Sequence, residues 1–330
     1  MSTFKVLLAN EVDGKPEVEF VKMEERDLPD GEVLIDVSYS ALNYKDGLAL
    51  NGNLGKVMRK LPMVPGIDLS GTVLESRISK FQEGERVFIT GGGLSEVAWG
   101  GYAQRARVKS DWLLHVPEAL DLKQVMAIGT AGVTAMLSIM ALEDTGLKAS
   151  DKPILVTGAA GGVGSLAVAI LSTLGYSVTA STGRPEAHQY LNELGAKDLI
   201  TRSDLARDAR PLESEKWGSV VDTVGSTTLA TVLAQVSRFG SIAVCGNAGG
   251  NSLTTTVLPM ILRGVNLLGI DSVYCPLDRR SMVWERLTKD LNIRKLDSIT
   301  QVIGFSDLLI KSKKILEGGV RGRVVVDLSR

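Results

Sequence analysis

The chain of 330 residues has few of the side chains that bind metals or form disulfides. It contains two cysteines, Cys245 and Cys275, and two histidines. The cysteines do not stand in a spacing typical of a redox or metal motif. A disulfide framework is therefore not expected, and the composition fits a reducing compartment, so we predict a protein of the cytoplasm.

The chain also lacks an excess of charge of one sign, and long apolar runs are scarce. The formal net charge of -1 leaves no broad basic surface for a nucleic acid or an anionic membrane. The first residues lead directly into a strand-like segment, without the basic and apolar regions of a signal peptide. No apolar run is expected to reach the roughly 20 residues that cross a bilayer. We therefore expect neither a nucleic-acid nor a membrane partner, and any anionic ligand must be bound locally.

The length of the chain predicts two domains. Residues 1–124 show short strands with alternating apolar residues between turn signals, which indicates a compact, barrel-like fold. From 125 to 296, short apolar strands alternate with helices, as in a parallel sheet covered on both faces. The tail, 297–330, has a helix near 306–317 and a strand at 323–327, and we expect it to return to the first domain. The strands predicted for the parallel sheet are 154–157, 177–180, 198–201, 219–222, 241–245 and 266–270.

A glycine-rich segment follows the first strand of the predicted parallel sheet. It reads Thr157-Gly158-Ala159-Ala160-Gly161-Gly162-Val163-Gly164 and departs from the dinucleotide-binding fingerprint at Ala159, where a glycine usually stands. Gly161 lets the backbone approach a pyrophosphate, and Gly164 allows close packing of the helix. A helix that begins near Gly162 directs free N–H groups and its dipole at that pyrophosphate. Such turns also arise for backbone reasons alone, but the strand before and the helix after favour a dinucleotide site.

The end of the second strand indicates which dinucleotide binds. A site for NAD usually has an acidic residue about 20 positions after the glycines, where it binds the ribose 2′-hydroxyl. Here the segment is Ser181-Thr182-Gly183-Arg184, and the next acid is Glu186. Hydroxyls and a guanidinium suit a 2′-phosphate, and Arg202 stands where it can close the other side. Either arginine alone can be a solvated surface charge, but the missing acid favours NADPH.

Several short motifs together resemble one family. The chain is similar to the medium-chain dehydrogenases/reductases, which have a GroES-like domain and a Rossmann domain, and more closely to their zinc-free, quinone-oxidoreductase-like branch. The resemblance runs along the whole chain and implies an α/β fold of a GroES-like β-rich domain plus a doubly wound parallel sheet. Its motifs are Leu42-Asn43-Tyr44-Lys45-Asp46, Pro65-Gly66-Ile67-Asp68, Trp99-Gly100-Gly101, Ile128-Gly129-Thr130-Ala131-Gly132 and Ile270-Asp271-Ser272.

The zinc ligands of the metal-dependent relatives are missing. Those relatives carry His-Glu after the Pro-Gly turn and four clustered cysteines, whereas this chain has Ile67-Asp68 and no cluster. We expect a structural role for His115 and an exposed position for His188. Without zinc ligands no Lewis acid polarises an alcohol or ketone, so the resemblance implies hydride transfer to an activated alkene or quinone.

The resemblance also implies the reaction and its central residue. It points to NADPH-dependent reduction of a short α,β-unsaturated acyl-CoA, with acrylyl-CoA giving propanoyl-CoA, and to Tyr44 as the polar group at the reacting centre. Water rivals the phenol as the proton source, because the pKa of tyrosine is ordinarily about 10. An ordinary buried aromatic is the other interpretation of Tyr44. Lys45 and Asp46 are interpreted as an ion pair that fixes the loop, and Asp68 and Asp222 as structural residues.

Further contacts follow from position in the family. The pyrophosphate is expected at Ala160, Gly161, Gly162 and Val163, the 2′-phosphate at Thr182, Gly183, Arg184 and Arg202, and the nicotinamide half at Tyr44, Asn247 and Ser272. Cations available for the phosphates of CoA are Lys56, Arg59, Lys60, Arg279, Arg280, Arg321 and Arg323.

Two alternative functions stay open: an NADPH:quinone oxidoreductase and a non-catalytic NADPH-binding sensor. The resemblance also implies a homodimer joined along the sixth strand, which the apolar run 265–270 permits.

Overall fold

The computed structural model describes residues 3–13, 15–51, 57–148 and 152–330. The chain divides into two compact units, the first formed by Met1–Thr130 with Thr300–Arg330 and the second by Ala131–Ile299. The sequence placed these divisions at 124/125 and 296/297. The first division lies within helix α3 (Leu122–Asp144), so the start of this helix belongs to the first unit.

The first unit contains a mixed sheet of seven strands and a separate two-stranded ribbon. Its strands are β1 (Phe4–Val12), β2 (Lys15–Met23), β3 (Val33–Leu42), β4 (Asp68–Ser76), β5 (Arg86–Thr90), β6 (Arg105–Val108), β7 (Leu114–His115), β14 (Thr300–Gly304) and β15 (Arg323–Asp327). The order is β14-β15-β3-β4-β5-β7, with β6 also paired to β3, and β1 pairs with β2. The alternation of β3 predicts Val33, Ile35, Val37 and Tyr39 on one face; the first three lie in the core, whereas Tyr39 is half-buried.

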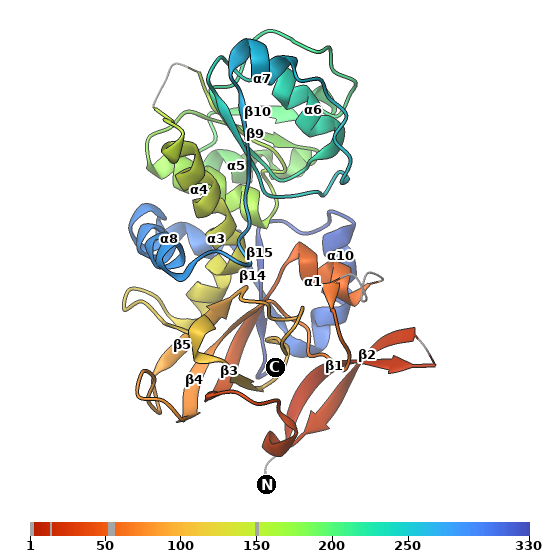
Figure 1. Ribbon diagram of the computed structural model, residues 1–330, viewed down its shortest axis with the longest axis vertical. Helices are drawn as coiled ribbons and strands as arrows, with labels where there is room; N and C mark the ends of the chain where they lie inside the picture. Colours follow the sequence, from red (N-terminus) through yellow and green to blue (C-terminus); the bar gives the residue numbers. More distant parts are fainter. Residues whose placement is uncertain (1–2, 14, 52–56, 149–151) are drawn as a thin grey trace. The chain divides into compact units, whose positions relative to one another are not determined.

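The tail of the chain completes this first sheet. β15 runs antiparallel to β3, with Val325 opposite Ala41, and β14 pairs with β15 on the outside. Helix α10 (Leu308–Leu316) contacts helix α1 (Tyr44–Leu50), and Figure 1 shows the blue α10 beside the orange α1. The strand predicted at 323–327 and the helix predicted near 306–317 are present, whereas β14 was not predicted.

The second unit is a parallel sheet of six strands in the order β10-β9-β8-β11-β12-β13. The strands are β8 (Ile154–Val156), β9 (Val178–Thr182), β10 (Asp198–Thr201), β11 (Ser219–Asp222), β12 (Ser241–Val244) and β13 (Asn266–Gly269). The helices are α4 (Gly162–Thr173), α5 (His188–Leu194), α6 (Ser226–Gln235), α7 (Leu258–Arg263), α8 (Leu277–Asp290) and α9 (Leu296–Ile299). Every residue of β8, β9 and β11 is buried, so both faces of the sheet are covered. This is the Rossmann order, and the predicted fold class is confirmed.

Helix α3 corrects one expectation from the sequence. It is long and apolar enough to cross a membrane, so the expectation that no run has this length was wrong. Nearly all of its apolar stretch is buried inside the protein, and Gly129 interrupts the helix with φ 53° and ψ −162°. These are the properties of a core helix, which is uniformly apolar because it is surrounded by protein.

Candidate cofactor and active site

The glycine-rich loop follows β8 directly and leads into α4. Gly158 has φ +58°, and a Cβ on Gly164 would stand 2.5 Å from the carbonyl oxygen of Gly158, so α4 packs on the loop as the sequence predicts. Gly161 is the N-cap of α4, and Gly161, Gly162 and Val163 are partly exposed. The N–H groups of a first helical turn have no acceptor within the helix. The loop therefore offers backbone donors and the positive end of a helix dipole to an anion.

Two arginines, Arg184 and Arg202, lie at the loop after β9. The Nη2 of Arg184 donates a hydrogen bond to the carbonyl of Ala160 (2.9 Å), which ties this loop to the glycine-rich loop. Arg202, at the end of β10, lies over Gly183, because a Cβ on Gly183 would stand 2.9 Å from its guanidinium carbon. The missing side chain at Gly183 is thus what leaves room for Arg202. Thr182 is buried and its hydroxyl accepts the N–H of Arg184 (3.2 Å), so Thr182, Arg184 and Arg202 all lie at the loop after β9.

The other predicted contacts lie at the carboxyl ends of β12 and β13. Asn247 is exposed, and its side chain donates to Asn251 Oδ1 (2.6 Å). Ser272 is partly buried, and its hydroxyl accepts a hydrogen bond from Thr134 Oγ1 (3.0 Å). Parallel strands end at one edge of the sheet, so the sheet brings these residues to the same edge as the glycine-rich loop.

Asp222 links two strands at this edge of the sheet. Its carboxylate is fully buried and accepts from Thr157 Oγ1 (2.6 Å) and from the N–H of Gly225 (2.8 Å). Burial raises its pKa, and the hydrogen bonds oppose this effect. The side chain joins the ends of β8 and β11, which agrees with the structural role expected for it.

Tyr44 is the first residue of α1, in the first unit. It is half-buried, and within the described residues its hydroxyl has no hydrogen-bond partner. The preceding Asn43 is the N-cap, and it forms a capping box with Asp46. Lys45 pairs with Glu96 and not with Asp46, so the expected Lys45–Asp46 ion pair was wrong. Asp46 turns inward because its carboxylate accepts the N–H of Asn43 (2.8 Å) at the start of the helix.

The two histidines stand apart from these residues. His115 is partly exposed and its Nε2 lies 3.0 Å from Glu85 Oε2, while its ring packs on Phe81. His188, which we expected to be exposed, is partly buried at the start of α5. In the parts of the chain that the structure describes, no three His, Cys, Asp or Glu side chains are placed to hold a metal ion.

Two of the cations considered for CoA are unsuitable. Arg323 is 2% exposed in its side chain and hydrogen-bonds Asn43, and Arg280 is buried and donates to the carbonyls of Ser272 and Val273. Both are used inside the protein, so they cannot line a cleft mouth. Arg279 pairs with Asp144. Lys56 lies outside the described residues, and the remaining cations, Arg59, Lys60 and Arg321, are exposed.

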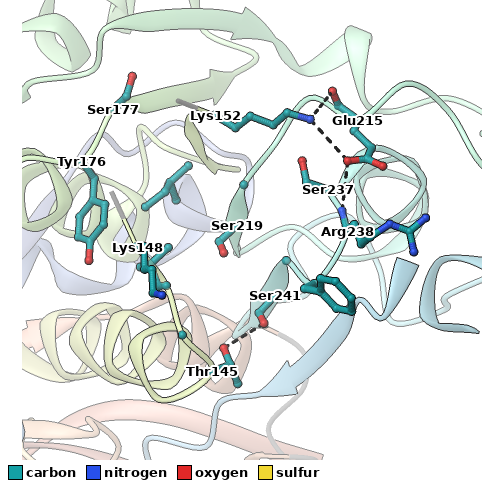
Figure 2. Close-up of a pocket in the computed structure, with 16 residues that line it drawn as sticks. Thr145, Lys148, Lys152, Tyr176, Ser177, Glu215, Ser219, Ser237, Arg238 and Ser241 are labelled. Atoms are coloured by element: carbon teal, nitrogen blue, oxygen red, sulfur yellow. Dashed lines mark hydrogen bonds and ion pairs between the residues drawn. The ribbon is translucent and has the colours of Figure 1, made fainter. Parts of the chain in front are cut away.

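A hollow of about 540 Å³ in the second unit lies at the opposite edge of the sheet. It is lined by Ile154, Ser219 and Ser241, which begin β8, β11 and β12. Figure 2 shows Lys152 reaching Glu215 on one side of it and Thr145 reaching Ser241 on the other. None of the cofactor residues predicted in the second unit lines this hollow, because they follow the carboxyl ends of the strands.

Comparison with known families identifies both halves of the chain. Residues 29–118 match the alcohol dehydrogenase GroES-like domain and residues 162–289 match the zinc-binding dehydrogenase domain. Acrylyl-CoA reductase AcuI of Ruegeria pomeroyi is 50% identical over 97% of each chain. The chain belongs to the medium-chain dehydrogenase/reductase family. The family that residues 162–289 match is described as a zinc-binding dehydrogenase, but the metal ligands of zinc-dependent members are not in this sequence.

Other similar proteins have different names. The probable acrylyl-CoA reductase AcuI of Escherichia coli is 46% identical, over 98% of this chain and 100% of that protein. The putative quinone oxidoreductase YhfP of Bacillus subtilis is 44% identical, over 99% and 100%. Among solved structures, the YhdH oxidoreductase of Salmonella enterica in complex with NADP has a TM-score of 0.94 and 47% identity, and covers 98% of this chain and 99% of that one. The structure of B. subtilis YhfP, with NAD bound, also has a TM-score of 0.94, at 43% identity, and covers 99% of this chain and 100% of that one.

Proposed function

We propose that this reductase uses NADPH to reduce the carbon–carbon double bond of a short α,β-unsaturated acyl-CoA, with acrylyl-CoA giving propanoyl-CoA. The protein is an NADPH-dependent oxidoreductase, as its family and its NADP-bound relatives indicate. The observation that carries the cofactor assignment is the pair of arginines around Gly183 in a loop without a carboxylate. Support for the substrate comes from relatives at 50% and 46% identity that are named acrylyl-CoA reductases.

The residues of the second unit fit this cofactor. The N–H groups at Gly162 and Val163 bind the pyrophosphate, and Arg184 and Arg202 bind the 2′-phosphate. Asn247 and Ser272 contact the nicotinamide half. When bound, NADPH supplies the hydride for the β-carbon of the substrate.

Tyr44 acts on the substrate oxygen. The thioester oxygen of an enoyl thioester becomes more negative as the double bond is reduced, and a hydrogen bond that strengthens with this charge lowers the barrier. The hydroxyl of Tyr44 is not used by the described residues around it, so it is available as this donor. Water then delivers the proton to the α-carbon as readily as a phenol does.

Turnover of three substrates tests this function. NADPH oxidation is followed by absorbance with acrylyl-CoA, crotonyl-CoA and a benzoquinone, each with the natural enzyme and with Tyr44→Phe. We expect acrylyl-CoA to be reduced fastest, and kcat to fall about tenfold or more in Tyr44→Phe because one hydrogen bond to the developing charge is lost. Binding of NADPH, measured by fluorescence, serves as the control, because a variant that still binds it is folded.

The second candidate is an NADPH:quinone oxidoreductase. It is favoured by the 44% identity to a protein named putative quinone oxidoreductase. Turnover with the benzoquinone and none with either acyl-CoA would replace our proposal with this one. NADPH binding without turnover of any substrate would instead point to a sensor.

A homodimer is the assembly that we propose. β13 is an edge strand of the second unit, and the surface beside it carries exposed apolar side chains, namely Phe239, Val257, Ile261, Leu262 and Leu267. Phe239 packs on Gly264, between α7 and β13, so these side chains gather at one edge. Contiguous apolar surface at a free strand edge is typical of an interface between copies.

A matched pair of substitutions tests the dimer. Ile261 on α7 is 67% exposed and Ile310 on α10 is 65% exposed. An aspartate at either position therefore lowers the stability of the isolated subunit only slightly. We expect Ile261→Asp to halve the mass measured by light scattering, and Ile310→Asp to leave it unchanged. A natural protein that is monomeric across the micromolar range would contradict the proposal.

We also propose that the reductase works in the cytoplasm. Both cysteines are free thiols. Burial raises the pKa of Cys245 to about 12, so this thiol stays protonated and unreactive. A protein that keeps such thiols does not depend on an oxidising compartment.

A further inference from the structure

A buried group of polar side chains lies behind Tyr44 in the first unit. We call it the Asn43 cluster, and it consists of Asn43, Asp46, Asp68, Thr130 and Arg323. Asp46 and Asp68 are 0% exposed, Arg323 is 2% exposed and Asn43 is 8% exposed. Charged groups are almost never this deeply buried unless they are paired and hydrogen-bonded.

Asn43 is the centre of this cluster. Its Nδ2 donates to Asp46 Oδ2 (3.1 Å) and to Asp68 Oδ2 (2.9 Å), and its Oδ1 accepts from Arg323 Nη1 (2.9 Å). Both ends of the amide are therefore fixed, and the side chain cannot turn without breaking charge-assisted hydrogen bonds. Because Tyr44 is the next residue along the chain, the cluster sets the backbone from which its side chain leaves.

Asp68 and Arg323 also hold the two segments of α3 at its kink. Asp68 accepts hydrogen bonds from the N–H (3.1 Å) and the hydroxyl (2.5 Å) of Thr130, which starts the helical segment after Gly129. Arg323 donates to the carbonyls of Ala127 (2.9 Å) and Met126 (3.3 Å), at the end of the segment before it. An acid at a helix start and a cation at a helix end both complement the helix dipole. The same two charges thus anchor the kink and Asn43.

The charges of the cluster do not cancel. Two carboxylates face one guanidinium, and the distance from Asp68 Oδ2 to Arg323 Nη2 is 3.9 Å. Burial, with a smaller effect of the neighbouring Asp68, raises the pKa of Asp46 to about 7 against its hydrogen bonds. Burial also raises the pKa of Asp68, and Arg323 and the hydrogen bonds to Asp68 oppose this shift. Apolar side chains of similar volume would fill such a core at a lower cost in free energy of folding.

We propose that Asp68 and Arg323 are positioning residues of the reductase, which act through Asn43 to hold the hydroxyl of Tyr44 where it meets the substrate oxygen. This inference rests on the function proposed for Tyr44. It changes the interpretation of both residues from the sequence, since Asp68 was given a structural role and Arg323 a place at the CoA entrance. Neither side chain touches the substrate.

The position of Tyr44 can be observed directly. The protein is labelled with 3-fluorotyrosine, and the ¹⁹F resonance of Tyr44 is identified by its loss in Tyr44→Phe. We expect Asp68→Asn to shift or broaden this resonance, because the amide cannot accept all the hydrogen bonds of the carboxylate. With acrylyl-CoA, kcat falls about tenfold while the KM for NADPH changes little, since the residues proposed to bind the phosphates of NADPH are untouched. Thr130→Val removes one donor to Asp68 at nearly constant volume, and we expect a smaller shift in the same direction.

Ser40→Ala is the matched control. The buried hydroxyl of Ser40 donates to the backbone carbonyl of Asp68 (2.6 Å) and does not contact its carboxylate. This variant loses a buried hydrogen bond at the same place, so it lowers stability, but it leaves the Tyr44 resonance unchanged if the carboxylate carries the effect. An equal shift in Ser40→Ala would assign the effect to general loosening and overturn the proposal.

The remaining outcomes separate this inference from the proposed function. An unchanged Tyr44 resonance in Asp68→Asn overturns the inference, and if that variant does not fold, an unchanged resonance in Thr130→Val does so. If the resonance shifts but Tyr44→Phe keeps its full rate, the cluster positions Tyr44, and it is the role of Tyr44 in the reaction that is wrong.

Discussion

Replacing Arg184 and Arg202 together by alanine is expected to raise the KM for NADPH about a hundredfold or more and to leave the KM for NADH almost unchanged. Both guanidinium groups lie at the loop after β9, Arg184 through its bond to Ala160 and Arg202 over Gly183. A charge-assisted hydrogen bond contributes about 1.5 to 3 kcal/mol, which is about one to two orders of magnitude in affinity. NADH has no 2′-phosphate, so it loses none of these bonds.

The control for this double variant is Arg294→Ala. Arg294 is an exposed arginine of the same unit, in the turn Ile293–Lys295 before α9 rather than in a loop that follows a strand of the parallel sheet. Its removal takes away one positive charge, where the double variant takes away two, without touching the loops at the carboxyl edge. Equal KM values for NADPH in the natural protein and the double variant would remove the 2′-phosphate site that we propose. Because one relative was solved with NAD bound, the assay measures both cofactors from the start.

Features that depend on residues near each other in sequence were predictable. The parallel sheet follows from short apolar strands, because a strand buried on both faces has no alternation to show. The bounds of β10, β11 and β15 agree with the prediction, and those of β8, β9, β12 and β13 differ by one or two residues. The glycine-rich loop was recognised because its chemistry requires glycine at fixed positions between a strand and a helix. The contact between Arg202 and Gly183 was expected only as a possible closure of the site.

Features that depend on distant residues were not predictable in this way. The partner of Asn43 is Arg323, which is 280 positions away, and nothing in the sequence near Arg323 distinguishes it from a surface cation. The spacing of Asn43 and Asp46 is that of a capping box and was a local signal that Asp46 turns toward the helix start rather than toward Lys45. The glycines and polar residues of α3 interrupt its apolar residues in the sequence, although in the fold they lie on one buried element that is kinked at Gly129.

Gly129→Ala is expected to destabilise the first unit strongly. The backbone at this residue, φ 53° and ψ −162°, is a region that only glycine adopts without strain, which costs about 1 to 3 kcal/mol. A Cβ there would also stand 2.6 Å from Nη2 of Arg323 and 2.8 Å from Oδ2 of Asp68, so it separates the two buried charges. Disturbing a buried ion pair costs about 3 to 5 kcal/mol. We expect the melting temperature to fall by about 10 °C.

Gly146→Ala separates the two causes of this loss. Gly146 follows the other end of α3 and has φ +90°, but a Cβ there would meet no atom of the described residues within 4 Å. It therefore carries the backbone strain without the clash, at about 1 kcal/mol, and we expect its melting temperature to fall by about 3 °C. Calorimetry of both variants beside the natural protein gives the comparison. Equal losses would mean that strain alone explains Gly129 and that Asp68 and Arg323 tolerate a methyl group between them, whereas a much larger loss at Gly129 means that the kink of α3 and the buried charges stabilise each other.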